Sequence, residues 1–371
     1  MYVLIFSAFL AFLISIAATP LAIRLFRRIG WGQFVREDGP DSHHTKRGTP
    51  TMGGIVFTFA TVLGYTIGKL VAWNPPSLSA LLILGLMVGI ALIGFLDDFT
   101  KISNQRSLGL TGWAKIAGQV IVGTVFAILA LFLRDSEGRT PVSLAISGVR
   151  DIPWLDLAQF GIIAGTVLYA LWVLFMIVST SNAVNVTDGL DGLATGASII
   201  AFSAYVFIGF WQFNQSCLQY GGGGAVNDDM YRCYDVSAPL DIAIVASCIV
   251  GALIGFLWYN TTPARIFMGD VGSLGLGGAL AGMAILTHTE LLLILVAGLP
   301  LIVTGSVIVQ RAYFKLTKGK RIFLMSPIHH HFELKGWAEV TIVVRFWIIA
   351  GLCVAAAVGL FYLEWVTHPR G

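Results

Sequence analysis

The stretch LLILGLMVGIALIGFLDDFTK, residues 81–101, decides the fold class. Residues 78–96, which begin three residues before this stretch, carry no charge. Their number is close to the roughly 20 apolar residues that a helix needs to cross a bilayer. Charged side chains begin where the apolar run ends, at Asp97 and Asp98. The stretch therefore predicts a membrane-spanning helix with two carboxylates at one end.

The rest of the chain repeats this apolar pattern. The 371 residues are 56% hydrophobic and 12% charged, whereas an ordinary soluble domain is about 25% charged. This composition excludes the soluble globular, disordered and fibrous classes, and a net charge of +3 gives no indication of nucleic-acid binding. We expect one all-α polytopic domain, 1–371, with about ten transmembrane helices near 2–23, 53–73, 78–96, 113–133, 159–178, 193–213, 241–259, 272–288, 290–310 and 342–366.

The basic residues predict the orientation. The first apolar run is expected to be a retained span rather than a signal peptide, because its basic residues follow the run. The loops after odd-numbered spans hold fourteen basic residues: Arg27, Arg28, Arg36, Lys46, Arg47, Lys101, Arg106, Arg265, Arg311, Lys315, Lys318, Lys320, Arg321 and Lys335. The loops after even-numbered spans hold four: Arg134, Arg139, Arg150 and Arg232. The positive-inside rule makes the first set cytoplasmic and both termini extracytoplasmic.

Two polar loops are expected on the extracytoplasmic side. The insertion at about 214–240 contains Cys217 and Cys233, for which a disulfide and two free thiols both stay open. The loop 134–158 is longer than a turn and suits a short hairpin or an interfacial segment. Cys248 and Cys353 lie in apolar runs and are expected to pack as small hydrophobic residues.

The cytoplasmic loops and span ends carry an unusual set of polar motifs. They are SHHTKRGTPTMGG with Lys46, FLDDFTK with Asp97 and Asp98, SNAVNVTDGLDGL with Asn185, Asp188 and Asp191, FMGDVGSLGLGG with Asp270, and SPIHHHFELKGW with His329, His330 and His331.

Each motif also has an ordinary structural explanation. Asp188, Asp191 and Asp270 precede apolar runs, so each suits a helix N-cap. Lys46 suits a positive-inside charge, and the histidines suit a solvated turn. Carboxylates at a helix C-terminus oppose the helix dipole, however, so Asp97 and Asp98 need a cation or a metal nearby.

The motifs together indicate a shared site. Five aspartates at three span ends need a counter-charge, and Mg²⁺ prefers carboxylates combined with water and substrate phosphates. Glycine-flanked helix starts expose N–H groups to phosphate, and Lys46 and Lys115 add positive charge. The combination predicts metal-assisted phosphoryl transfer at the membrane surface.

These motifs, with PIHHHFELKGW as the most specific, resemble those of the phospho-N-acetylmuramoyl-pentapeptide transferase family, within the polyprenyl-phosphate N-acetylhexosamine-1-phosphate transferase superfamily. The resemblance covers about residues 20–350. It implies Mg²⁺-dependent attack of undecaprenyl phosphate on UDP-N-acetylmuramoyl-pentapeptide, with release of UMP and formation of lipid I. It also implies a multi-pass location in the bacterial cytoplasmic (inner) membrane, and a homodimer is compatible with it.

The resemblance also implies residue roles. Asp270 resembles the Mg²⁺ ligand, and Asp97 resembles a proposed base for the lipid phosphate, with Asp98 beside it. His329 and His330 match histidines near the diphosphate and sugar. The nucleotide-sugar pocket is matched by Lys46, Asn185, Asp188, Asp191, Asn260, Phe267 and Gln310, with Phe267 stacking on uracil.

Two alternatives stay open at this point. One is transfer of N-acetylglucosamine-1-phosphate to the same lipid, which the triple-histidine motif disfavours. The other is a secondary transporter, a class that places ionisable groups near the bilayer midplane. Here the acidic residues lie at span ends, so we expect an enzyme.

Overall fold

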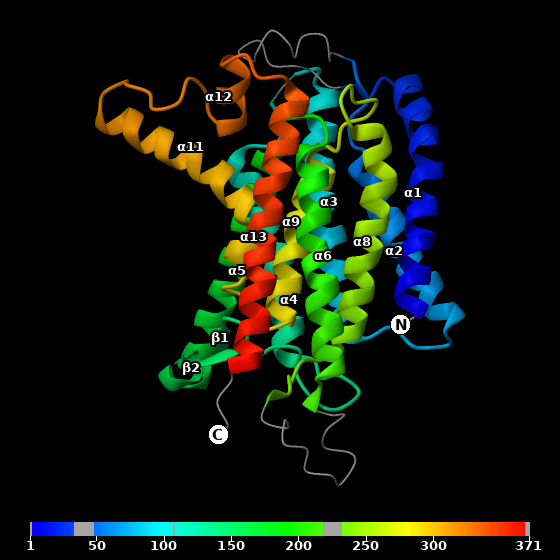
Figure 1. Cartoon of the computed structure of the whole chain (residues 1–371), viewed down its shortest axis with the longest axis vertical. Coiled ribbons are helices and arrows are strands. Elements are labelled where there is room, and N and C mark those ends of the chain that lie inside the picture. The colour runs from blue at the N-terminus through cyan, green and yellow to red at the C-terminus, as the bar shows by residue number, and fades with distance from the viewer. Residues whose placement is uncertain (1, 33–47, 107, 218–231, 368–371) are drawn as a thin grey trace.

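The computed structural model describes residues 2–32, 48–106, 108–217 and 232–367 as a bundle of long helices (Figure 1). Within these residues nine helices are long and apolar enough to cross a membrane. They are α1 (Tyr2–Arg28), α2 (Gly54–Val71), α3 (Leu78–Ser103), α4 (Gly112–Phe132), α5 (Ile162–Thr187), α6 (Leu193–Asn214), α8 (Pro239–Asn260), α9 (Gly269–Leu286) and α13 (Glu339–Thr367). The expectation of an all-α polytopic membrane protein is confirmed.

The helix α9 forms the centre of the bundle. It packs against α2, α3, α5 and α6, and 89% of its apolar window is buried. Its sequence GDVGSLGLGGALAGMAIL is dominated by small residues, which allow backbones to approach closely inside a membrane bundle. By contrast, α1, α4, α5 and α13 bury only 22–28% of their windows, so their apolar outer faces are suited to lipid.

The predicted continuous span at 290–310 is wrong in one respect. The chain forms the short helix α10 (Leu293–Val296), breaks at Ala297, and continues as α11 (Gly298–Leu316), which leaves the bundle (Figure 1). Pro300 explains the break, because its ring would clash with the carbonyl of Val296 in an uninterrupted helix. After α11 the chain returns to the bundle through the short helix α12 (Ile328–Leu334).

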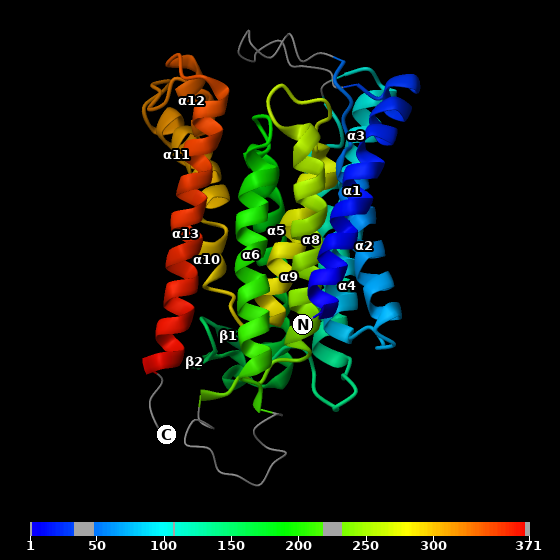
Figure 2. The same ribbon diagram turned by 45° about the vertical axis from the view of Figure 1, so that its right-hand side comes forward.

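The opposite end of the bundle carries the two polar loops. The hairpin alternative for residues 134–158 is confirmed, since β1 (Ala145–Ser147) pairs with β2 (Asp151–Asp156) and the 3-10 turn Leu157–Phe160 leads into α5. The disulfide alternative is also confirmed, because Cys217 and Cys233 are bonded. The start of α1 and the end of α13 both lie toward this end, away from α12 (Figures 1 and 2).

Candidate active site

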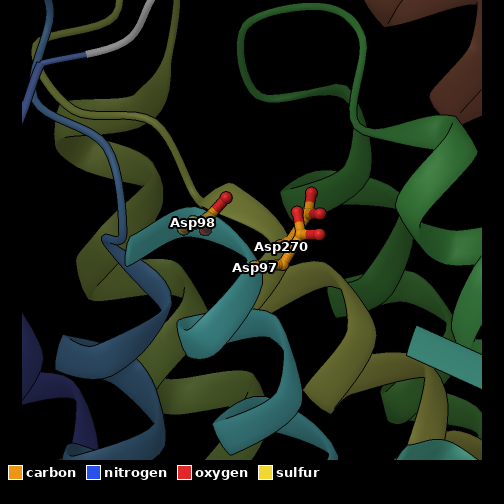
Figure 3. A group of neighbouring side chains, drawn as sticks. All are labelled: Asp97, Asp98 and Asp270. Atoms are coloured by element: carbon orange, nitrogen blue, oxygen red, sulfur yellow. The ribbon is translucent and has the colours of Figure 1, made fainter. Parts of the chain in front are cut away.

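Three carboxylates converge near the end of the bundle that carries α12. Asp97 and Asp98 belong to α3 and Asp270 to the first turn of α9, and one oxygen of each lies within 4.8 Å of the others. Figure 3 shows Asp97 and Asp270 side by side, with Asp98 beside them on the same turn of α3. Asp97 and Asp98 are almost fully buried. Both lie inside α3, which continues to Ser103 rather than ending at residue 96.

Two lysines neutralise part of this charge. Lys101 Nζ lies 2.7 Å from Asp97 Oδ2, 3.0 Å from Asp98 Oδ1 and 3.0 Å from Asp270 Oδ2. Lys115 Nζ lies 2.7 Å from Asp270 Oδ2 and 3.4 Å from Asp97 Oδ2. The expected need for a cation beside the aspartate pair is therefore met within the chain. Lys101 was expected only as a loop charge, although its spacing of four and three residues from Asp97 and Asp98 places it on their helix face.

The helix α5 completes this part of the site. Asn185 Nδ2 donates to Asp270 Oδ1 at 2.8 Å and to Ser273 Oγ at 2.9 Å, so it fixes the orientation of the carboxylate. Asp188 follows as the C-cap of α5. Burial, together with the neighbouring carboxylates of Asp270 and Asp98, raises the pKa of Asp188 to about 8.

Close backbone packing holds the carboxylates at this spacing. A methyl group on Gly94 of α3 would overlap the carbonyl of Asp270, so glycine allows the two helices to meet there. Gly269 has φ +73° at the start of α9, a conformation that favours glycine. Two residues further on, the Val271 N–H donates to Asp98 Oδ2 at 3.3 Å. The N-cap explanation for Asp270 is wrong, because the N-cap residue is Met268 and the Asp270 carboxylate contacts lysines and Asn185 instead.

A second group of predicted residues shapes the loop that carries Phe267. Asp191 Oδ2 accepts from Ala264 N, and Asn260 Nδ2 donates to the Ile266 carbonyl, both at 2.9 Å. The Phe267 backbone pairs with Pro50 and Gly53, which lie in the second half of the Lys46 motif. Because Gly192 occupies the N-cap of α6, the N-cap explanation for Asp191 is also wrong. Lys46 itself lies outside the described residues.

The histidines and Gln310 lie around the return from α11. His329 is buried in α12 against Gly189, and so reaches the α5–α6 turn between Asp188 and Asp191. His330 Nδ1 is hydrogen-bonded to Glu333 Oε2. Gln310 accepts from Ile322 and Phe323 backbone N–H groups, which fixes the loop before α12. The structure thus brings Asp97, Asp98, Asp270, Asn185 and Lys115 together. The other predicted residues that it describes lie in α8, α11 and α12 or on the adjoining loops.

The fold is that of a polytopic membrane protein with an acidic cluster at one end, and its similarity to known proteins defines the class as a phosphosugar transferase. Residues 80–288 match the family model Glycosyl transferase family 4, and residues 46–57 match phospho-N-acetylmuramoyl-pentapeptide-transferase signature 1. Three similar proteins bear the name phospho-N-acetylmuramoyl-pentapeptide-transferase. The one from Clavibacter sepedonicus is 63% identical over 94% of this chain and 95% of its own length. Those from Arthrobacter sp. (strain FB24) and Streptomyces avermitilis are 57% and 53% identical, over 99% and 98% of each chain.

The chain therefore belongs to the phospho-N-acetylmuramoyl-pentapeptide-transferase family. It is an enzyme, so the secondary transporter alternative is set aside.

Proposed function

We propose that this enzyme transfers phospho-N-acetylmuramoyl-pentapeptide from its UDP-linked donor to undecaprenyl phosphate, giving lipid I and UMP. The observation that carries the proposal is the cluster of Asp97, Asp98 and Asp270 with two lysines in a chain of this family. Such a cluster suits a reaction between two phosphates, whose charge must be neutralised before they can approach each other.

The charge balance of the site favours a divalent cation. Three carboxylates and the two ammonium groups of Lys101 and Lys115 leave one net negative charge, which by itself repels a phosphate. The carboxylate oxygens are hard ligands within 4.8 Å of one another, a donor set that Mg²⁺ prefers. We propose Asp270 as the direct ligand, with Asp97 and Asp98 completing the site. When bound, Mg²⁺ would stabilise charge on the transferring phosphoryl group.

Positioning accounts for the remaining chemistry. A phosphate monoester has its second pKa near 6 and is largely ionised at neutral pH, so Asp97 need not act as a strong base. Its Oδ1 accepts from the Leu110 N–H at 2.9 Å, which fixes the carboxylate direction. We propose that Asp97 orients the lipid phosphate in line with the scissile bond, while Lys101 and Lys115 release from the aspartates to contact substrate phosphates.

The nucleotide sugar is proposed to lie over the second group of residues. Phe267 is half-buried on a loop that Asp191 and Asn260 hold in place, and an aromatic ring so fixed can stack on a base. Lys46, Asn185, Asp188 and Gln310 are proposed to border the same pocket. His329 and His330 are proposed to face the diphosphate and sugar, next to the α5–α6 turn.

We also propose an orientation for the helix bundle in the membrane. The basic-residue asymmetry puts the active-site end in the cytoplasm and the disulfide and both termini outside the bacterial inner membrane. An impermeant maleimide applied to intact cells should label a single cysteine at Glu137 and should not label one at Lys320. The reverse pattern would overturn the orientation.

The decisive experiment is a UMP-release assay with the purified chain and undecaprenyl phosphate, with and without Mg²⁺. We expect release with UDP-N-acetylmuramoyl-pentapeptide and loss of release when Mg²⁺ is removed. Release with UDP-N-acetylglucosamine alone would instead assign the superfamily alternative. Full activity after removal of divalent cations would contradict the metal assignment while leaving the transferase activity intact.

A further inference from the structure

The helix α11 exposes an apolar face where it leaves the bundle. Its inner face is marked by Leu299, Val303, Ser306 and Gln310, which are buried and spaced three or four residues apart. The outer face carries large apolar side chains in two stripes with a seven-residue spacing: Leu301 and Ile308, and Ile302, Val309 and Leu316. Leu316 is 83% exposed, so this face has no protein partner within the described residues.

The end of α11 and the loop after it concentrate positive charge. We call residues 308–324 the arm; it carries five exposed basic residues, Arg311, Lys315, Lys318, Lys320 and Arg321. No acidic residue occurs in the sequence between Glu290 and Glu333. In the part of the chain that the structure describes, none of the five forms an ion pair with a carboxylate. The arm is therefore a cationic surface without internal compensation.

We propose that the arm is a docking surface for the anionic headgroups of bilayer phospholipids. An amphipathic helix with an apolar face and flanking Lys or Arg residues binds at the membrane interface, with the apolar face among acyl chains. Arg311 and Lys315 are four residues apart beside the apolar stripe, so their long side chains can reach the headgroup level. Lys115 differs from them because it is already paired with Asp270.

The apolar stripe distinguishes a lipid from other anionic ligands. A soluble nucleotide would need positive charge but no apolar surface beside it. The stripe instead extends the apolar outer surface of the bundle, on which Leu352 of α13 is 66% exposed. Each basic residue near an anionic membrane surface strengthens attraction by about fivefold, so five such residues select acidic lipids over zwitterionic ones. Gln310 of α11 accepts from the Ile322 and Phe323 N–H groups, so α11 and the loop that leads to α12 are held together within the arm.

The test measures which lipid lies beside the arm. The full chain, with Cys248→Ala and Cys353→Ala, carries an NBD fluorophore at Leu316→Cys in nanodiscs of phosphatidylcholine and phosphatidylglycerol. One lipid at a time carries a nitroxide on its acyl chain. At equal bulk fractions we expect phosphatidylglycerol to be enriched about threefold or more near the probe. This enrichment should fall toward one at high salt, because salt screens exposed charges.

Two controls keep the result interpretable. The same probe at Leu352→Cys on α13 should report no preference between the lipids. The variant R311Q/K315Q/K318Q/K320Q/R321Q should lose the preference at residue 316 while remaining quenched by both lipids and active in phosphatidylcholine. If that variant does not fold, K318Q/K320Q/R321Q should show a partial loss of the preference.

Three outcomes would overturn the proposal. Equal quenching by both lipids at residue 316 would show that the arm does not select anionic headgroups. Absence of quenching by either lipid would show that the arm does not lie in the bilayer. A raised KM for the UDP-sugar in the neutral variant, without any lipid preference in the unaltered chain, would assign the charges to nucleotide capture.

Discussion

The two ends of the bundle each bury a lysine–aspartate cluster, but the clusters are balanced differently. At the end with the disulfide, Asp241 of α8 accepts from Lys69 at 2.9 and 3.0 Å, from Tyr65 at 3.0 Å and from the Ser77 N–H at 3.1 Å. One carboxylate there meets one ammonium group. At the other end, Asp97, Asp98 and Asp270 share two lysines among the residues that the structure describes.

This difference separates a structural ion pair from the proposed binding site. A buried charge is tolerated when its partner and hydrogen bonds are complete, as they are for Asp241. The three-carboxylate cluster retains excess negative charge in a partly buried place, which a cation that is not part of the chain can neutralise. Substitutions in the three-carboxylate cluster should therefore change turnover, and substitutions of the Lys69–Asp241 pair should change stability.

The largest expected effect is on turnover in Asp270→Asn. Loss of the ligand charge should remove several kcal/mol of transition-state stabilisation, a rate loss on the order of 10³ or more. The thermal midpoint should change little, because two carboxylates would then face two lysines. UMP release and its Mg²⁺ dependence, measured beside the thermal midpoint, check this. Turnover near that of the unaltered protein would remove the metal-ligand assignment and with it the contrast between the two ends.

The second prediction concerns stability at the opposite end. Asp241→Asn should destabilise the fold by about 3–5 kcal/mol, since Lys69 would remain buried without its counter-charge. Thermal unfolding of the purified chain tests this, with Lys69→Met/Asp241→Leu as the matched control. The double variant should recover much of the stability, because an apolar pair of similar volume avoids the unpaired charge. A fully stable Asp241→Asn protein with impaired Mg²⁺ dependence would mean that the two clusters are not distinct.

The third prediction concerns Phe267, which lies just before α9 at the end of the bundle that holds the three carboxylates. Stacking of a base on an aromatic ring is worth about 1–3 kcal/mol, so Phe267→Ala should weaken binding of the UDP-sugar roughly 5- to 150-fold. The KM for the lipid phosphate should stay nearly unchanged, and Phe267→Tyr should retain affinity because it keeps the ring. Titration calorimetry with the nucleotide sugar checks both variants. If the alanine variant bound the UDP-sugar with unchanged affinity, Phe267 would have only a packing role.

The sequence predicted the features that the membrane itself imposes. Backbone groups in lipid must bond within a helix, so apolar runs such as 78–96 and 193–213 located helices reliably. The grouping of Asp97, Asp98 and Asp270 also followed from charge, since isolated carboxylates at buried helix ends need a shared partner. The tight contact at Gly94 that sets their spacing depends on tertiary packing and could not be read from one chain.

Other features were missed for identifiable reasons. Hydropathy alone did not reveal the break before α11, although Pro300 was a local signal for it. Lys101 was overlooked because α3 was expected to end before it, so its side chain was not placed on the face of Asp97. Asn260 and Gln310 hold loops through hydrogen bonds to backbone groups 6 to 13 residues further along the chain, and a backbone partner cannot be recognised from the residue types.

The smallest expected effect tests whether burial, rather than the ion pair as such, separates the clusters. Arg139 Nη1 lies 2.6 Å from Asp235 Oδ1 at the disulfide end, but Asp235 is 73% exposed. Exposed ion pairs contribute about 0–1 kcal/mol, because solvent screens the charges and ordering the side chains costs entropy. Arg139 also keeps Glu137 and Asp135 as partners. Asp235→Asn should therefore leave both the thermal midpoint and turnover close to those of the unaltered protein. A destabilisation as large as that of Asp241→Asn would show that charge pairing, and not burial, sets the energetic cost of losing a carboxylate.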